Sequence, residues 1–329
     1  MKLPRRNFLR LTAGAAALPV VSHIARAESY PARPITMLVG FAPGGSADIT
    51  ARIVGERMKA SLGQPIVVEN VVGAAGSIAA GRVVRAAADG YTLSIGSLGT
   101  HVFNGALYTL PYDLLNDLQP VSLLTDGSFV IVAKKSMPAN DLKSFIAWLK
   151  ANPGRASQGT PGPGSGPHVL GAFLQSATST SFQFVPYRGG GPAMQDLVAG
   201  HIDFLIATAP EALPQIRLGH IKPYAITAKS RIASAPDIPT AEEAGLAGFH
   251  MSLWYALWAP KGTPRDVISK LNGAVVDALA DPAVRSRLAD LGQEVVSRDQ
   301  QGPDALAAFQ KAEIDRWWPI IKAANIKGE

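Results

Sequence analysis

Short apolar runs alternate with amphipathic segments along most of the chain. Residues Ile35 to Phe41 form an apolar run typical of a buried strand, and Ile49, Ile53 and Met58 in the next segment share one face of a helix. The same pattern predicts strands over 66–69, 91–95, 129–133, 182–185, 204–207 and 224–227, and helices over 78–88, 142–149, 168–175 and 194–198. This alternation predicts an α/β protein whose sheets are largely parallel and covered by helices.

The last quarter of the chain has a different pattern. After a predicted strand at 254–258, three helical segments follow with little strand between them, and two of them start at Thr-Pro and Asp-Pro pairs. The last helix is expected to begin at Pro303 and to be disturbed at Pro319, because proline lacks an N–H group. This helical tail indicates a lobe that is interrupted and completed later in the chain.

The length and composition allow about two domains. The chain has 329 residues, of which 47% are hydrophobic, so it can bury a sizeable core. We predict lobe 1 over 30–126 and 252–329, and lobe 2 over 127–251.

The first 27 residues have the pattern of an export signal. The sequence MKLPRRNFLRLTAGAAALPVVSHIARA starts basic, contains the twin arginines Arg5 and Arg6, continues apolar and ends in a small-x-small cleavage site. The apolar stretch covers 14 residues, from 11 to 24, whereas a membrane-spanning helix needs about 20. We therefore expect cleavage after Ala27 and a soluble periplasmic protein, in preference to the alternative of an N-terminal anchor.

The net charge is concentrated in this leader. The leader supplies five basic residues and no acid, so of the formal charge of +6 only about +1 remains for residues 28–329. We therefore expect no nucleic-acid partner. The chain has no cysteine, so it can form no disulfide and can carry no lipid on an N-terminal cysteine. The lack of cysteine also gives little support to a zinc site, and we expect no metal or cofactor.

Four glycine-rich turns follow predicted strands or precede predicted helices. They are FAPGGSAD at 41–48, GSLGT at 96–100, GTPGPGSGPH at 159–168 and YRGGGP at 187–192. Turns after parallel strands meet at one edge of a sheet, so we expect a shared cleft. Helix N-termini bind anions. Arg188 is the one Lys or Arg side chain in these turns. Backbone N–H groups together with one arginine favour a carboxylate ligand, and a phosphate could be bound in the same way. The first turn has neither a P-loop nor a G-x-G-x-x-G pattern.

Longer motifs resemble one known family over the whole chain from about residue 30. The sequence is similar to the Bug-type receptors, which are the periplasmic solute-binding proteins of tripartite tricarboxylate transporters. The segments that carry this resemblance are FAPGGSADITAR, GQPIVVENVVGAAGS, VPYRGGGPAMQDLVAGHID, IPTAEEAGLAGF and WYALWAPKGTPRDVISKLN.

The resemblance implies a fold, a ligand class and a site. The fold is the two-lobe, type II-like Venus flytrap of periplasmic binding proteins, with two mixed, mainly parallel sheets and a C-terminal helical extension. The implied partners are a small carboxylate and the membrane permease subunits of a tripartite transporter, and we expect a monomer. The implied ligand contacts are Phe41, Gly44, Gly45, Ser46, Asp48, Ser97, Thr160, Gly164, Ser165, His168, Tyr187, Arg188 and Gly189. Pro161, Pro163 and Pro167 each remove an N–H donor from the lobe 2 loop, so its contacts are expected to differ from the family's usual set.

Several of these residues also have purely structural interpretations. Asp48 falls in the first turn of a helix, where an acid is favoured by the helix dipole, and it would repel a bound carboxylate. His168 could pack or cap at a helix start, and Tyr187 could be a core residue. Arg188 is the strongest candidate for a direct contact, because a guanidinium next to three glycines suits bidentate recognition.

Two other classes of function remain open. A hydrolase is disfavoured, because Ser165 and His168 lack a Gly-x-Ser-x-Gly elbow with its partners and no paired carboxylates stand out. A sensor that presents its closed form to a signalling protein would bind ligand in the same way as a transport receptor and would differ only in its partner.

Overall fold

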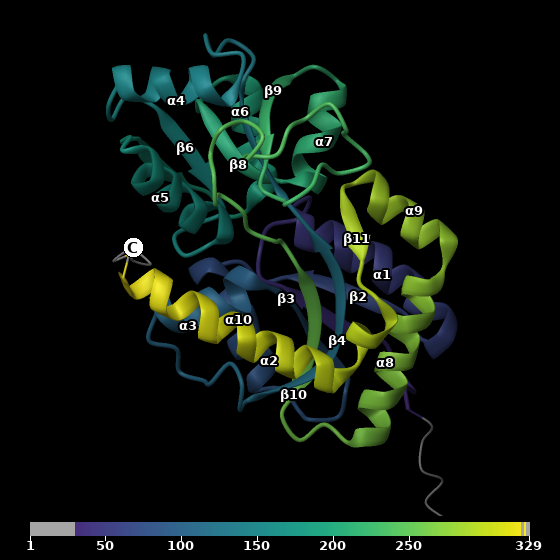
Figure 1. The fold of residues 1–329 in the computed structure, drawn as a ribbon. Helices are drawn as coiled ribbons and strands as arrows, with labels where there is room; N and C mark the ends of the chain where they lie inside the picture. Colours follow the sequence, from purple (N-terminus) through teal and green to yellow (C-terminus); the bar gives the residue numbers. More distant parts are fainter. Residues whose placement is uncertain (1–29, 324–325, 327–329) are drawn as a thin grey trace, which may run out of the picture.

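The computed structural model describes residues 30–323 and residue 326. The predicted export signal and its cleavage site after Ala27 lie outside these residues. The described chain forms two sheets with their own helices, and Figure 1 shows the resulting two lobes one above the other.

Lobe 1 contains a six-stranded sheet with the order β11-β4-β10-β3-β1-β2. Its strands are β1 (Ile35–Val39), β2 (Ile66–Asn70), β3 (Thr92–Ser97), β4 (Leu118–Gly127), β10 (Tyr255–Pro260) and β11 (Gln293–Val295). Its helices are α1 (Ser46–Leu62), α2 (Ser77–Val84), α3 (Asn104–Leu107), α8 (Arg265–Ala280), α9 (Pro282–Asp290) and α10 (Pro303–Ala323). Three short helical turns, η1 (Ala74–Gly76), η2 (Gly99–Phe103) and η3 (Arg298–Gln301), complete the lobe.

Lobe 2 contains a five-stranded sheet with the order β7-β6-β8-β5-β9. Its strands are β5 (Phe129–Lys134), β6 (Ser157–Thr160), β7 (Gln183–Pro186), β8 (Phe204–Thr208) and β9 (Ile221–Ile226). Its helices are α4 (Leu142–Ala151), α5 (Gly166–Thr178), α6 (Gly190–Ala199) and α7 (Ala209–Arg217). All five strands of this sheet are contributed by one continuous segment of the chain.

Both sheets are mixed, as predicted, but parallel pairing is less extensive than expected. Parallel pairs join β1 to β2 and β3, and β6 to β7 and β8. The other five pairings in the described chain are antiparallel. The reason is that β4, β5 and β10 adjoin the passages between the lobes and enter their sheets without the crossover helix that parallel pairing requires.

The chain passes between the lobes at 127–129 and at 251–253, and we call these two paired segments the hinge. Leu253 N donates to Gly127 O at 2.9 Å, and Ser128 forms an antiparallel bridge with Ser252. Below them the buried Thr227 hydroxyl accepts from Phe129 N at 3.0 Å and donates to Met251 O at 2.9 Å. The two hinge segments are therefore tied to each other and to Thr227, the residue that follows β9.

The C-terminal helix α10 packs across the front of the lobe 1 sheet in Figure 1. The fully buried Trp254 and Trp258 donate from their indole nitrogens to Glu313 and Gln310 of α10. Pro319 lies inside α10 and does not end it, because the helix continues to Ala323. Trp318 just before this proline donates to Val102 O at 2.8 Å and so anchors that part of the helix to lobe 1.

Candidate ligand-binding cleft

The four glycine-rich turns lie at the junction of the two lobes. The turns after β1 and β3 belong to lobe 1, and the turns after β6 and β7 belong to lobe 2. Residues from all four turns line one cavity of about 40 Å³, which we call the inner cavity. The turns therefore converge on a single cleft, as expected from the rule for strand ends.

A larger, more open cavity of about 800 Å³ adjoins the inner one, and we call it the outer cavity. Phe41 and Pro161 line both cavities, so the two are parts of one cleft. The outer cavity is also lined by Tyr108, Arg188 and residues 72–76. Among its lining residues Arg188 is the one cation.

Three helices that begin at the cleft start without a side-chain cap from the residue that precedes them. Helices α1, α5 and α6 begin after Gly45, Ser165 and Gly189, and none of these residues caps its helix with a side-chain hydrogen bond. By contrast, α4 and α9 begin after Asp141 and Asp281, whose carboxylates accept from first-turn amides. At these three helix starts the preceding residue therefore provides no side-chain cap for the first-turn N–H groups, which lie next to the positive end of the helix dipole.

The structure places the predicted site residues in three groups. Those lining the inner cavity are Phe41, Gly45, Ser46, Ser97 and Ser165, and those lining the outer cavity are Phe41, Tyr187 and Arg188. The others, Gly44, Asp48, Thr160, Gly164, His168 and Gly189, lie in the same turns or helix starts but line neither cavity in this conformation.

Asp48 is buried and fully engaged inside lobe 1. Its carboxylate accepts hydrogen bonds from Gly44 N, from Asn70 Nδ2 and from the guanidinium of Arg52, the last at 2.8 and 3.0 Å. Burial alone would raise the pKa of Asp48, but these hydrogen bonds together hold it below its ordinary value. The Asp48 carboxylate therefore holds the first turn of α1 in place, which agrees with the interpretation that Asp48 has a structural role.

His168 and Tyr187 also have partners within lobe 2. Nδ1 of His168 lies 3.1 Å from Gly164 N and accepts its hydrogen bond, and burial lowers the pKa of this histidine. Tyr187 donates to Asp196 Oδ2 at 2.6 Å. Ser165 donates to Gly162 O at 2.7 Å, so Ser165 and His168 bind different backbone groups and are not arranged as nucleophile and base.

The lobes are in contact across the cleft. Tyr108 of lobe 1 donates to Pro163 O of lobe 2 at 2.6 Å, and Ala42 N donates to Arg188 O at 3.1 Å. The inner cavity has room for a few waters, since each needs about 10–15 Å³, but its 40 Å³ cannot hold an organic acid. The described conformation is a closed one, and a ligand could enter the inner cavity only after the lobes move apart.

Glu211 is a cleft residue that the sequence reasoning missed. It lies in the first turn of α7 and lines the inner cavity, where its carboxylate accepts from Ser46 N of lobe 1 at 3.1 Å. The sequence does contain a pattern that identifies Glu211 as a helix-start residue, because Thr208-Ala-Pro-Glu211 matches the S/T-x-x-E pattern.

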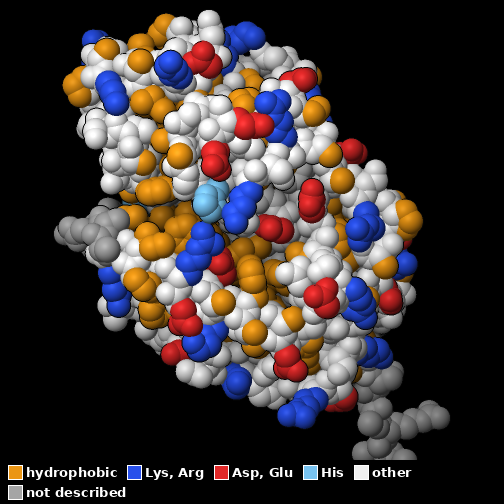
Figure 2. Space-filling view, viewed as in Figure 1, with side chains coloured by type: hydrophobic (Ala, Val, Ile, Leu, Met, Phe, Trp, Pro, Cys, Tyr) orange, Lys and Arg blue, Asp and Glu red, His pale blue; other side chains and the backbone are white. Residues whose placement is uncertain are grey.

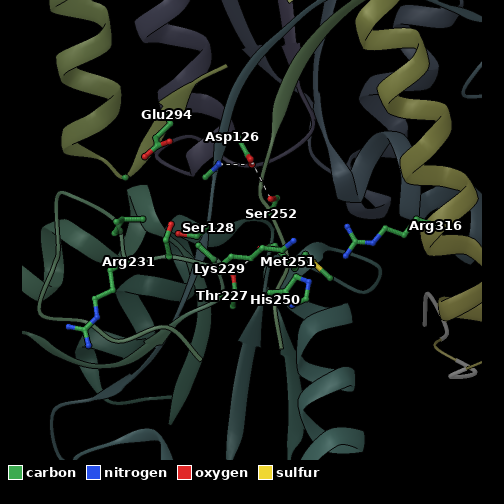
Figure 3. Close-up of a pocket in the computed structure, with 15 residues that line it drawn as sticks. Asp126, Ser128, Thr227, Lys229, Arg231, His250, Met251, Ser252, Glu294 and Arg316 are labelled. Atoms are coloured by element: carbon green, nitrogen blue, oxygen red, sulfur yellow. Dashed lines mark hydrogen bonds between the residues drawn. The ribbon is translucent and has the colours of Figure 1, made fainter. Parts of the chain in front are cut away.

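A separate hollow of about 340 Å³ lies at the hinge. Figure 2 shows Lys, Arg, Asp, Glu and His side chains around a hollow at the junction of the lobes. In the close-up of Figure 3, Arg316 extends from α10 and Glu294 from β11, and Asp126 is hydrogen-bonded to Ser252. None of the predicted site residues lines this hollow.

Two further properties concern the described residues. Among them, no helix combines the length and the apolar character needed to cross a bilayer. In the same part of the chain, no cluster of three or more His, Asp or Glu side chains is placed to hold a metal ion.

Comparison with known proteins places this architecture among related receptors. Residues 50–326 match the family described as "Tripartite tricarboxylate transporter family receptor". The structure titled "periplasmic binding protein BugD" is 35% identical with a TM-score of 0.88, and the match covers 91% of this chain and 100% of that one. The predicted two-lobe α/β fold of periplasmic binding proteins is confirmed.

Two other similar structures were solved with bound acids, both in proteins of Rhodopseudomonas palustris. MatC with bound malate is 40% identical, with a TM-score of 0.86, and the match covers 89% of this chain and 100% of that one. Rpa4515 with adipate is 31% identical, also with a TM-score of 0.86, and the match covers 91% of this chain and 99% of that one.

Proposed function

Because this chain belongs to the tripartite tricarboxylate transporter receptor family, we propose that it is a periplasmic receptor that binds a small carboxylate between its lobes and presents it to membrane permease subunits. The family is one of solute-binding receptors. The malate and adipate in two similar structures support an organic acid as the ligand class. The predicted export signal at 1–27 supports the location.

The observation that carries the proposal is the arrangement of helix starts at the cleft. Helices α1, α5 and α6 come from both lobes, point their first turns at one cavity and have no side-chain cap from the residue that precedes each helix. Each helix start carries roughly half a positive charge, so an anion between them is stabilised by both lobes at once. Arg188 at the outer cavity adds a guanidinium for a further carboxylate group.

The proposed mechanism is a two-state closure about the hinge. In the open state the ligand binds the amides of one lobe, and closure brings the N–H groups of the other lobe onto it. The ligand favours the closed state by its differential affinity, and the permease recognises that state. We propose that lobe 1 comprises residues 30–126 and 252–329, and that lobe 2 comprises residues 127–251. The positions of the two hinge passages support these boundaries.

A thermal-shift panel of carboxylates tests this proposal. A ligand at about 100 times its Kd adds about 2.7 kcal/mol to the free energy of unfolding, which raises Tm by about 4 °C for a folded chain of about 300 residues. Native mass spectrometry of freshly purified protein should also detect a co-purified small acid. Absence of a shift with every acid and of any co-purified ligand would refute the proposal, and formation of a product from a bound acid would favour an enzyme.

A further inference from the structure

A carboxylate of the protein itself occupies the start of α1 in the cleft. Glu211 of lobe 2 accepts from Ser46 N of lobe 1 at 3.1 Å through Oε1, and from Thr208 N of its own helix at 3.3 Å through Oε2. The first N–H group that α1 offers to an anion is therefore already bound to Glu211 when the lobes are closed.

The surrounding backbone leaves space for this carboxylate. A Cβ atom on Gly190, at the start of α6, would lie 2.0 Å from Glu211 Oε1, and one on Gly45 would lie 3.4 Å from it. The carboxylate thus sits between the starts of α1 and α6. Both helix starts have glycine at the position that faces it.

No cation of the inner cavity balances this carboxylate. The described residues that line the inner cavity include no Lys, Arg or His, and Glu211 has no ion pair within the described chain. The other ionisable group there is Tyr255, which is buried and whose pKa is raised by burial and also by Glu211. Burial raises the pKa of Glu211 above its ordinary value, so its ionised form is already disfavoured, and a second carboxylate placed against it would add like-charge repulsion in a site shielded from water.

We propose that Glu211 determines ligand specificity by selecting organic acids that carry a hydroxyl or amino group, which donates a hydrogen bond to Glu211 in the inner cavity. This inference rests on the proposed carboxylate-receptor function. The carboxyl groups of such a ligand bind the amides of α5 and the outer cavity next to Arg188, away from Glu211. An acid without a donor leaves the remaining acceptor sites of the Glu211 carboxylate desolvated and without a partner, which a site built for a hydrogen bond rejects strongly.

The same chain contains a matched control for Glu211. Glu243 follows Thr240 at the same spacing in Thr240-Ala-Glu-Glu243, and its carboxylate accepts from Thr240 N at 2.8 Å. Glu243 also belongs to the proposed lobe 2, but it is exposed and lines none of the cleft cavities. The E243Q variant therefore changes the same Thr-x-x-Glu contact, here at a turn outside the site.

Isothermal titration with matched acids tests the proposal. The probes are succinate, malate and aspartate, and glutarate, 2-hydroxyglutarate and glutamate, because each set keeps one carbon skeleton and changes only the donor. In at least one set the wild-type protein should bind the hydroxy or amino acid at least tenfold tighter than the unsubstituted acid, about 1.4 kcal/mol. In E211Q this ratio should fall toward one, whereas E243Q should keep it.

Three results would overturn the proposal. Equal binding of substituted and unsubstituted acids by the wild-type protein would refute it without any variant, and would leave the carboxylate-receptor function intact. A ratio that E211Q retains would assign Glu211 to helix capping alone. Failure of the wild-type protein to bind any acid, in these sets or in the carboxylate panel, would remove the receptor function and with it this inference.

Discussion

The amide of Ala42 and the carbonyl of Arg188 form a backbone hydrogen bond of 3.1 Å that joins the two lobes across the cleft. The side chain of Arg188 is exposed and lines the outer cavity, where it is the one cation. The backbone of this residue therefore contributes to closure, while its guanidinium remains available to a ligand.

We predict that R188A removes most of the thermal shift produced by a carboxylate ligand. The Tm of the ligand-free protein should change little, because the backbone hydrogen bond is kept and substitutions at exposed positions usually cost within about 0.5 kcal/mol. Thermal-shift assays with and without ligand measure both effects. R155A, at another exposed arginine of lobe 2, is the control; a ligand shift in R188A equal to that of wild type would exclude Arg188 from the site.

Substitution of Gly40 by alanine should destabilise lobe 1. Gly40 follows β1, and a Cβ atom there would lie 2.5 Å from the Cα atom of Gly76, so two backbone segments would have to separate. Overpacking of this kind costs about 1–3 kcal/mol, which should lower Tm by several degrees. In G273A, on helix α8, a Cβ atom meets nothing within 4 Å, and this control should be neutral or slightly stabilising. An unchanged Tm in G40A would contradict the described packing of these segments.

The T227V substitution should weaken the hinge. The Thr227 hydroxyl is buried and makes two hydrogen bonds, to Phe129 N and Met251 O, whose loss leaves both backbone groups unpaired. A cost of about 1–3 kcal/mol is expected in urea unfolding. The control is T92V on β3, because the side chain of Thr92 makes no such hydrogen bonds in the described chain. T92V should lower the free energy of unfolding by less than T227V. Equal losses in the two variants would mean that the hinge contacts contribute nothing specific to stability.

His101 should make stability depend on pH in the acid range. It is fully buried against Trp258, with ring centroids 3.9 Å apart, and burial lowers its pKa to about 3. The unfolded chain binds a proton near pH 6.5 that the folded protein does not bind until about pH 3, so stability is highest above pH 6.5 and falls as pH drops through this window. The slope from this group is at most about 1.4 kcal/mol per pH unit.

Urea unfolding of wild type and H101Q between pH 7 and pH 4.5 measures this contribution. The variant should lose stability less steeply toward acid, whatever its stability at pH 7. Identical slopes in the two proteins would show that His101 does not titrate differently in the folded state.

Apolar periodicity was sufficient to predict most of the strands, because β1, β5 and β8 are buried runs of mainly apolar residues and β3 alternates the apolar Leu93 and Ile95 with polar residues. It missed β6, whose sequence Ser-Gln-Gly-Thr is polar although its Gln158 and Thr160 are buried. Gln158 is accommodated there because its side chain donates to Pro167 O at 2.9 Å. Such a tertiary hydrogen bond leaves no trace in a hydrophobicity pattern.

The family and the position of the cleft were also predictable, because the motifs at the glycine-rich turns are local in sequence. The family prediction is confirmed by the match over residues 50–326. The individual ligand contacts remain predictions. Glu211 could be recognised as a helix-start residue from Thr208-Ala-Pro-Glu211, but its approach to Ser46 depends on how the lobes close, which no local pattern encodes.

The position of β10 has a consequence for biosynthesis. This strand lies between β3 and β4 in the lobe 1 sheet, yet it is made more than 120 residues after both of them. Until β10 leaves the ribosome, β3 and β4 have exposed edges that invite aggregation. Lobe 2, made from one continuous segment, should therefore be complete first, and nascent lobe 1 should be the part that most needs a chaperone.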